Sequence, residues 1–128
     1  MEAEDYFKGT KVYVWRKDFA IIKSNKTNPN AFANIVDKKE TTVIIEEGKY
    51  NNEDIIEIEK GWKILTFDIE LPFSLTDFLA KISNTLAQEK ISIFVVSTYS
   101  TDHILIKKQD LQKAEEKLKN LGFIIEEK

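Results

Sequence analysis

The polar side chains of residues 97–103 are of the types that could do chemistry. Ser97 and Ser100 carry hydroxyls, Asp102 carries a carboxylate, and His103 is the single histidine of the chain. A Ser-His-Asp triad is not expected, because Asp102 and His103 are neighbours at the start of a predicted strand and diverge to opposite faces. The chain contains no cysteine, which excludes a Cys-His pair. The sequence therefore predicts a protein that is not an enzyme.

Cofactors and metal ions are not expected either. The four glycines are scattered singly and form no phosphate-binding loop. The carboxylates are numerous, but their spacing is not that of metal ligands. His103 is therefore interpreted as a structural or surface residue rather than as a general base.

The same polar residues could instead bind an amino acid. Asp102 could pair with an amine or guanidinium group, Ser97 and Thr98 could form hydrogen bonds, and Tyr99 offers a flat apolar wall. A predicted helix begins within residues 71–76, near this turn. Its unpaired backbone N–H groups and partial positive charge would suit an α-carboxylate. A plainer interpretation also stands, in which residues 97–102 are an ordinary hairpin turn.

The elements that position these residues follow from hydrophobic periodicity. Apolar residues alternate in a strand at 62–71, and they repeat at helical spacing in residues 74–88, where Ser74 is a good N-cap. The remaining predicted elements are a hairpin within 91–107, a helix at 109–121 ended by Gly122, and a strand at 123–125. The order β-α-β-β-α-β predicts an α+β, ferredoxin-like second half with both helices on one face.

Residues 62–121 also resemble a known family. The segments that carry the resemblance are Ile91-Ser92-Ile93-Phe94, Ser97-Thr98-Tyr99, Asp102 with Ile104-Leu105, Gly61-Trp62-Lys63, and Asp110-Leu111-Gln112-Lys113-Ala114. They are similar to the ACT domains of the CASTOR type, which are small regulatory modules that bind amino acids. The resemblance implies two tandem ACT-like halves, of which the first is irregular. The animal members of this family sense arginine.

The resemblance implies a ligand site at the place that the residues suggest. Its ligand-binding positions correspond here to Pro72, Phe73, Ser74, Leu75, Thr98, Tyr99 and Asp102. Many ACT domains have a glycine early in the first helix, which lets the backbone approach the ligand. The corresponding residue here is Asp77, whose side chain could either block a carboxylate or cap the helix together with Ser74.

The first half of the chain has strand patterns but no amphipathic helix. Residues 1–9 are expected to fray, residues 12–15 and 19–22 to form a hairpin, and residues 23–30 to form a loop. Two further strands are predicted at 31–36 and 41–45, around a polar turn at 37–40, followed by a linker at 46–54 and an extended segment at 55–58. We expect two domains, an irregular ACT-like half at 1–60 and an ACT domain at 61–128.

Composition limits the partners. The net charge of −3 does not fit nucleic-acid binding, and no apolar run approaches the length of about 20 residues that spans a membrane. The absence of cysteine fits a reducing, cytoplasmic location. The predicted strand at 91–96 is apolar on both faces, with Ile91, Ile93 and Val95 on one and Phe94 and Val96 on the other. Since only one face is covered by helices, the other needs the irregular first half, a second chain, or both. We expect a homodimer.

Two functions from different classes remain open. One is a regulatory or sensor protein that binds an amino acid. The other is a non-catalytic dimerisation or interaction module whose pocket is vestigial. A pocket open beside Asp102 would favour the first, and a pocket filled by Phe73 and Tyr99 would favour the second.

Overall fold

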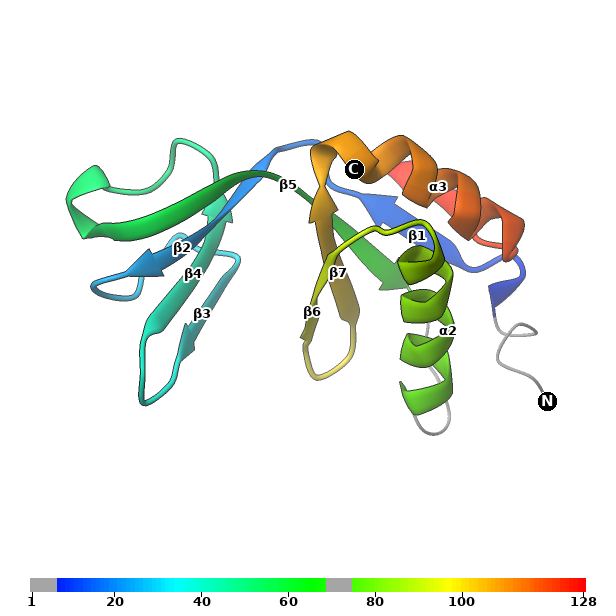
Figure 1. The fold of residues 1–128 in the computed structure, drawn as a ribbon, viewed down its shortest axis with the longest axis horizontal. Coiled ribbons are helices and arrows are strands. Elements are labelled where there is room, and N and C mark those ends of the chain that lie inside the picture. Colours follow the sequence, from blue (N-terminus) through cyan, green and yellow to red (C-terminus); the bar gives the residue numbers. More distant parts are fainter. Residues whose placement is uncertain (1–6, 69–74) are drawn as a thin grey trace. The chain divides into compact units, whose positions relative to one another are not determined.

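The computed structural model describes residues 7–68 and 75–128, excluding the side chains of residues 75–77. Along the described chain the elements are β1 (Lys11–Val14), β2 (Phe19–Ser24), β3 (Ala33–Val36), β4 (Thr41–Glu46), the 3-10 helix η1 (Asn52–Asp54), β5 (Ile55–Asp68), α2 (Leu75–Gln88), β6 (Ile93–Ser97), β7 (Asp102–Lys107), the 3-10 helix η2 (Lys108–Asp110), α3 (Leu111–Asn120) and β8 (Ile124–Glu127). The α+β class and the β-α-β-β-α-β order from β5 to β8 confirm the prediction (Figure 1).

The chain forms two compact units. The helical unit contains the chain up to Arg16 together with Lys63–Lys128, and the strand unit is Lys17–Trp62. β5 runs from the strand unit into the helical unit without a break. The division into domains at 1–60 and 61–128 stays a prediction, and the contacts group β1 with the helical unit rather than with the rest of the first 60 residues.

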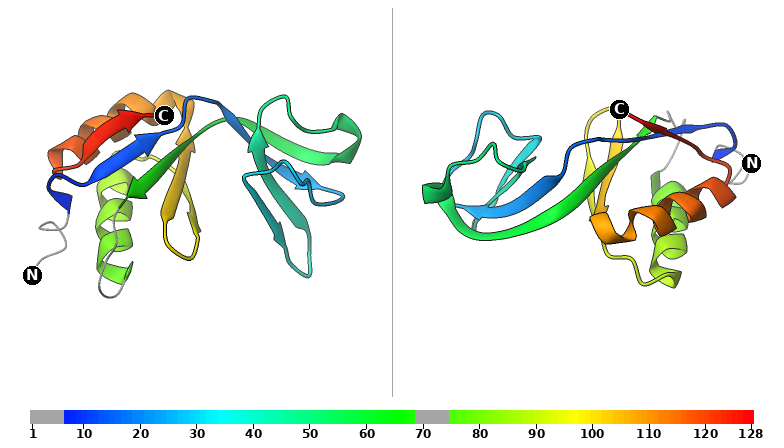
Figure 2. Two further views of the ribbon diagram at one scale, coloured as in Figure 1. Left: turned by 180° about the vertical axis from the view of Figure 1, so that it is seen from behind. Right: turned by 90° about the horizontal axis from the view of Figure 1, so that it is seen from above.

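The sheet of the helical unit has the strand order β8-β1-β5-β7-β6. α2 and α3 lie on one of its faces, as predicted (Figures 1 and 2). β1 pairs antiparallel with β5 and parallel with β8, so that Val12 lies between Phe67 and Ile125. The predicted hairpin between 12–15 and 19–22 is therefore wrong. A short apolar strand indicates that it is to be buried, but it does not specify which strand it pairs with.

Alternation in the strands and helical spacing in α2 and α3 build the core of the helical unit. Leu65 and Phe67 of β5 point toward the helices, and the buried stripe of α2 is Phe78, Ile82 and Leu86. The buried helix face of α3 comprises Ala114 and Leu118. These buried positions confirm the predicted helix faces. Burying each large aliphatic or aromatic side chain contributes roughly 1.5–3 kcal/mol to stability.

An N-terminal aromatic residue completes this core. The ring of Phe7 is fully buried, stacks on Phe123 at a centroid distance of 4.7 Å, and meets Phe78 edge-on at 5.6 Å. The expectation that residues 1–9 fray is therefore wrong for Phe7. The Gly9 N–H donates to the Gly122 carbonyl at 2.9 Å, which fastens this segment to the end of α3.

Gly122 ends α3 in the way that the sequence predicts. Its φ is +110°, a conformation that residues with a Cβ rarely adopt. A Cβ at this position would lie 3.0 Å from the Cα of Lys8, so the N-terminal segment also needs the missing side chain. One glycine therefore serves both the helix end and the close approach of the first described residues.

The strand unit is an antiparallel sheet in the order β3-β4-β2-β5. One buried cluster of this unit consists of Ala20, Ile22, Val43 and Ile45. β3 and β4 confirm the strands predicted at 31–36 and 41–45. In the turn between them, Asp37 Oδ1 accepts hydrogen bonds from the N–H groups of Lys39 at 2.7 Å and Glu40 at 2.9 Å. The N–H groups of Glu40 and Lys39 lower the pKa of Asp37 by stabilising its carboxylate.

The predicted linker at 46–54 is wrong. This segment lies inside the strand unit and contains η1, which leads directly into β5. The extended residues predicted at 55–58 and the strand predicted from 62 belong to one strand, which is described as far as Asp68. Polar residues in a turn and a short 3-10 helix resemble a linker in sequence, because neither buries much apolar surface.

Candidate functional site

The β6–β7 hairpin carries the predicted polar residues. The two strands pair antiparallel, with Ser97 opposite Asp102 at the end next to the turn. The Thr98 N–H donates to the Thr101 carbonyl at 2.8 Å, and the Thr98 hydroxyl donates to the same oxygen at 3.0 Å. The strand pairing and these two hydrogen bonds therefore close the turn between Ser97 and Asp102.

Asp102 is already engaged within the hairpin. The hydroxyl of Ser97 donates to Asp102 Oδ1 at 2.7 Å, and Asp102 is only 5% exposed. A charge-assisted hydrogen bond of this kind stabilises a buried carboxylate by roughly 1.5–3 kcal/mol. Thus Asp102 has a structural role whether or not a ligand binds to it.

The other predicted residues of the hairpin face solvent. Thr98 is exposed, and the side chain of Tyr99 is fully exposed, so it forms no wall against other described residues. The structure thus brings Ser97 and Asp102 into contact and leaves Tyr99 away from them. Their assignment to a ligand site stays a prediction.

The structure describes only part of the predicted site at the start of α2. Pro72, Phe73 and Ser74 lie outside the described residues. Leu75 is the first residue of α2, but its side chain and that of Asp77 are not described. The first turn of α2 and the turn of the β6–β7 hairpin lie at the same end of the helical unit, as Figures 1 and 2 show. The convergence of residues 71–76 on this hairpin turn stays a prediction.

His103 belongs to a hydrogen-bonded group that the sequence did not reveal. The indole N–H of Trp15 donates to Thr66 Oγ1 at 2.8 Å, and Thr66 Oγ1 lies 2.7 Å from Nδ1 of His103. The Thr66 proton can then be donated to Nδ1, which places the imidazole proton on Nε2. Burial lowers the pKa of His103, and the nearby Asp102 carboxylate partly opposes this shift. His103 is thus structural, in agreement with the sequence interpretation.

Two further expectations concern metals and membranes. Among residues 7–68 and 75–128, no group of three or more His, Cys, Asp or Glu side chains could hold a metal ion. Within the same residues no helix has the length and the apolar character that crossing a membrane requires.

Comparison with known proteins decides the family. A sequence model of the ACT domain matches residues 57–120, which is half of the chain and includes α2, the β6–β7 hairpin and α3. The chain belongs to the ACT domain family. Within it, the chain is of the CASTOR type: it is 28% identical to the human protein CASTOR3P over 98 residues. That match covers 68% of this ACT protein and 60% of CASTOR3P, so the chain spans about three-fifths of that relative.

Solved structures share the fold of this ACT protein. Protein Atu0741 from Agrobacterium tumefaciens superposes with a TM-score of 0.80 and 21% identity, covering 94% of each chain. The aspartate kinase of Clostridium acetobutylicum, an allosteric enzyme, gives a TM-score of 0.68 and 15% identity, covering 86% of this chain and 34% of the kinase. At these identities the likeness concerns the fold alone.

Proposed function

We propose that this ACT protein is a small, non-catalytic regulatory protein that binds an amino acid. The observation that carries the proposal is the match to the ACT domain over residues 57–120, the part that contains the hairpin and α2. ACT domains are regulatory modules, and the described residues hold no catalytic set. The protein is proposed to need no cofactor, to act in the cytoplasm, and to bind neither nucleic acid nor membrane.

The proposed ligand lies between the start of α2 and the β6–β7 hairpin. The segment of Pro72, Phe73, Ser74 and Leu75 would receive the α-carboxylate, because the N–H groups at a helix start attract anions. Ser97, Thr98, Tyr99 and Asp102 would receive the amine or the side chain. Asp102 is oriented by Ser97 before any ligand arrives, which reduces the entropy that is lost on binding.

The burial of Asp102 limits which ligand groups can reach it. A carboxylate that is 5% exposed can be contacted by a slender cationic group more easily than by a bulky one. Tyr99 would have to move from solvent to cover such a ligand. The Tyr99 side chain is fully exposed, so no other described residue packs against it and opposes such a movement.

A thermal-shift screen against the twenty amino acids tests the proposal. A ligand that binds only the folded state raises the unfolding temperature in proportion to its concentration relative to its dissociation constant. One amino acid, or one chemical class, should raise it, and isothermal titration should then give a saturating isotherm. Twenty unchanged unfolding temperatures at millimolar concentrations would contradict amino-acid binding.

A second function is favoured by the contact between Ser97 and Asp102. If this hydrogen bond is the whole role of Asp102, the pocket is vestigial and the protein is a non-catalytic dimerisation or interaction module.

Homodimerisation is proposed with either function. β6 is a sheet edge that pairs with β7 alone among the described strands, and its Phe94 and Val95 are exposed. It carries no charge and no proline that would prevent pairing with another chain.

A further inference from the structure

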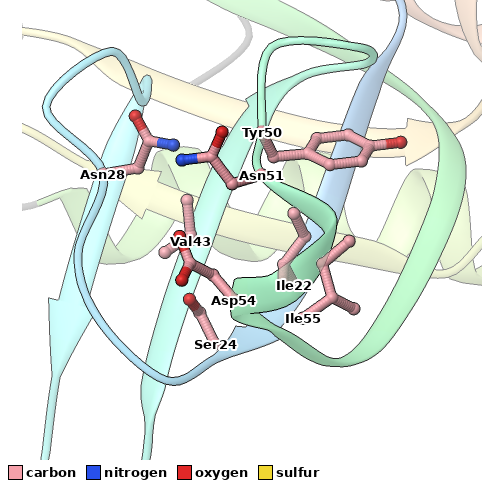
Figure 3. A pocket seen from close by; sticks show the side chains of 8 residues that line it. All are labelled: Ile22, Ser24, Asn28, Val43, Tyr50, Asn51, Asp54 and Ile55. Carbon is pink, nitrogen blue, oxygen red and sulfur yellow. The ribbon is translucent and has the colours of Figure 1, made fainter.

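The strand unit contains a small pocket, lined by residues of β2, β4, η1, β5 and the loops beside them (Figure 3). Its volume is about 10 Å3, which is room for about one water molecule. An amino acid is too large for a space of this size. This pocket is therefore not a second site for the proposed ligand, and the proposed site lies in the helical unit, which contains α2 and the β6–β7 hairpin.

Four phenylalanine rings form a closed cluster in the core of the helical unit. Phe7 stacks on Phe123 at a centroid distance of 4.7 Å and an interplanar angle of 25°. Phe78 meets Phe7 edge-on at 5.6 Å and Phe67 edge-on at 5.3 Å. Phe67 in turn meets Phe123 edge-on at 5.4 Å. All four side chains are at most 4% exposed, so the position of each ring depends on its neighbours in the cluster.

The four rings come from four separate segments of the chain. Phe7 belongs to the N-terminal segment, residues 7–10, and Phe123 lies between α3 and β8. Phe67 is next to the last described residue of β5, and Phe78 is the fourth residue of α2. In the sequence, Phe67 and Phe78 therefore flank the start of α2, which is part of the proposed ligand site.

Backbone hydrogen bonds fasten the N-terminal segment beside the end of α3 (Figure 1). The Gly9 N–H donates to the Gly122 carbonyl at 2.9 Å, and the Ile124 N–H donates to the Thr10 carbonyl at 2.8 Å. The ring of Phe7 extends from this attachment to the ring of Phe78 on α2. Phe7 therefore connects the N-terminal segment, which is bonded to the end of α3, with the start of α2.

We propose that Phe7 is a positioning residue for the proposed ligand site, because its ring couples the N-terminal segment to the start of α2. The inference rests on the proposed function, in which the start of α2 receives the α-carboxylate of an amino acid. In a close-packed core, the space left by a missing ring is only partly filled by shifts of its neighbours. Loss of the Phe7 ring should therefore loosen the start of α2 more than its end.

Hydrogen exchange of the full chain without any ligand tests the coupling. In Phe7→Ala, the backbone amides of residues 79–81 should exchange roughly tenfold faster or more than in the wild type. The amides of residues 89–91, which bond to carbonyls at the end of α2, should change less. The matched control is Leu86→Ala, at a fully buried position roughly 12 Å further along the same helix than Phe78. It should show the opposite pattern, with the greater acceleration at residues 89–91.

Equal acceleration at both ends of α2 in Phe7→Ala would overturn the coupling, because Phe7 would then stabilise the core as a whole. If Phe7→Ala does not fold, Phe7→Leu takes its place, since leucine fills part of the space and removes the ring contacts. Faster exchange confined to residues 79–81 in that variant supports the coupling, and equal changes at residues 79–81 and 89–91 overturn it.

Isothermal titration tests the role in binding, with each of the twenty amino acids that raises the unfolding temperature of the wild type. At a temperature where every variant is folded, the dissociation constant should rise roughly fivefold or more in Phe7→Ala and stay within about twofold in Leu86→Ala. An unchanged affinity in Phe7→Ala, or an equal loss in both variants, would overturn the positioning role. If no amino acid binds the wild type, the proposed function is contradicted, and the exchange measurement alone decides whether Phe7 controls the start of α2.

Linkage makes the effect reciprocal. A ligand whose affinity depends on the docked Phe7 ring must favour that docked position by the same factor. In the wild type, a saturating amino acid from the titration should therefore slow the exchange of the Gly9 amide, which bonds to Gly122. This slowing should be lost in Phe7→Ala and kept in Leu86→Ala. An amide of Gly9 that exchanges at the same rate with and without the bound amino acid would overturn the linkage.

Discussion

Asp102 is the residue at which a structural role and the proposed binding role meet. Its carboxylate accepts a hydrogen bond from the Ser97 hydroxyl at 2.7 Å. The same carboxylate raises the pKa of His103 and so partly offsets the lowering that burial causes. The sequence predicted a candidate anion at the start of a strand. It did not indicate that this anion already has a hydrogen-bond donor, because Ser97 and Asp102 are brought together by strand register.

Asp102→Asn separates the two roles. Asparagine keeps an oxygen for Ser97 and removes the charge, so the free energy of unfolding should fall by about 1 kcal/mol or less. Affinity for a ligand found in the amino-acid screen should fall roughly ten- to hundredfold, since a charge-assisted hydrogen bond is lost. Calorimetric titration and a urea melt measure both quantities on one variant.

The matched control is Asp110→Asn, because Asp110 is at the N-cap of α3 and makes no capping hydrogen bond through its side chain. It should leave both affinity and stability nearly unchanged. If Asp102→Asn keeps full affinity and loses more than about 2 kcal/mol of stability, Asp102 is a turn residue and the interaction-module function is favoured.

His103 should make stability depend on pH. Its pKa is lowered in the folded state, so the unfolded chain binds the proton more tightly. Stability should be complete above the unfolded pKa of about 6.5 and should fall as pH decreases through 6.5 toward the folded value. Urea melts between pH 7.5 and 5.5, roughly one unit either side of that value, measure this slope, which His103→Gln should flatten. A slope that is the same in both proteins would assign it to carboxylates instead, since the chain has no other histidine.

At the level of elements, periodicity predicted which faces are buried better than it predicted which strands pair. The α2 stripe, the α3 face and the Gly122 end are as expected, since each depends on residues within a few positions of one another. The pairing of β1 depends on residues more than 50 positions away in β5 and more than 100 away in β8. No local pattern records such a partner.

Leu79 and Ile82 lie near the middle of α2, and replacing each with alanine should lower the free energy of unfolding by a different amount. Ile82 is fully buried, whereas Leu79 is only partly buried against the same core. Ile82→Ala should lower the free energy of unfolding by roughly 2–5 kcal/mol, and Leu79→Ala by about 1–2 kcal/mol. Urea melts of the two variants measure the difference. Equal losses, or a greater loss for Leu79→Ala, would mean that α2 presents a different face to the sheet.

At the level of the whole molecule, the proposed homodimer depends on the edge of the sheet in the helical unit. Among the strands that the structure describes, β6 and β8 are the two edges of that sheet. Ile124 of β8 is 47% exposed and Val95 of β6 is 41% exposed, but β8 also carries Glu126 and Glu127, which oppose pairing with a second copy. The uncharged edge is the one expected to pair.

Val95→Lys should dissociate the homodimer. Two copies that pair antiparallel through β6 would bring the introduced ammonium groups near one another, so the dissociation constant should rise by roughly tenfold or more. Sedimentation velocity over a micromolar concentration series measures it, with Ile124→Lys as the control on the other edge. A wild-type chain that remains monomeric would remove the homodimer, and dissociation by Ile124→Lys alone would assign the interface to β8.

The sequence by itself determined the α+β class, the order of elements from β5 to β8, the buried helix faces and the polar hairpin. Those features depend on residues only a few positions apart. The fixed repeat of a helix or a strand decides which of these residues share a face. Only the tertiary structure decided that β1 inserts between β5 and β8 and that Phe7 completes the core. It also decided two hydrogen-bonded contacts: Ser97 donates to Asp102, and Thr66, which accepts from Trp15, bonds to His103. Each of these requires residues distant in the chain to meet, and such meetings are set by the free energy of packing the whole unit rather than by any local preference.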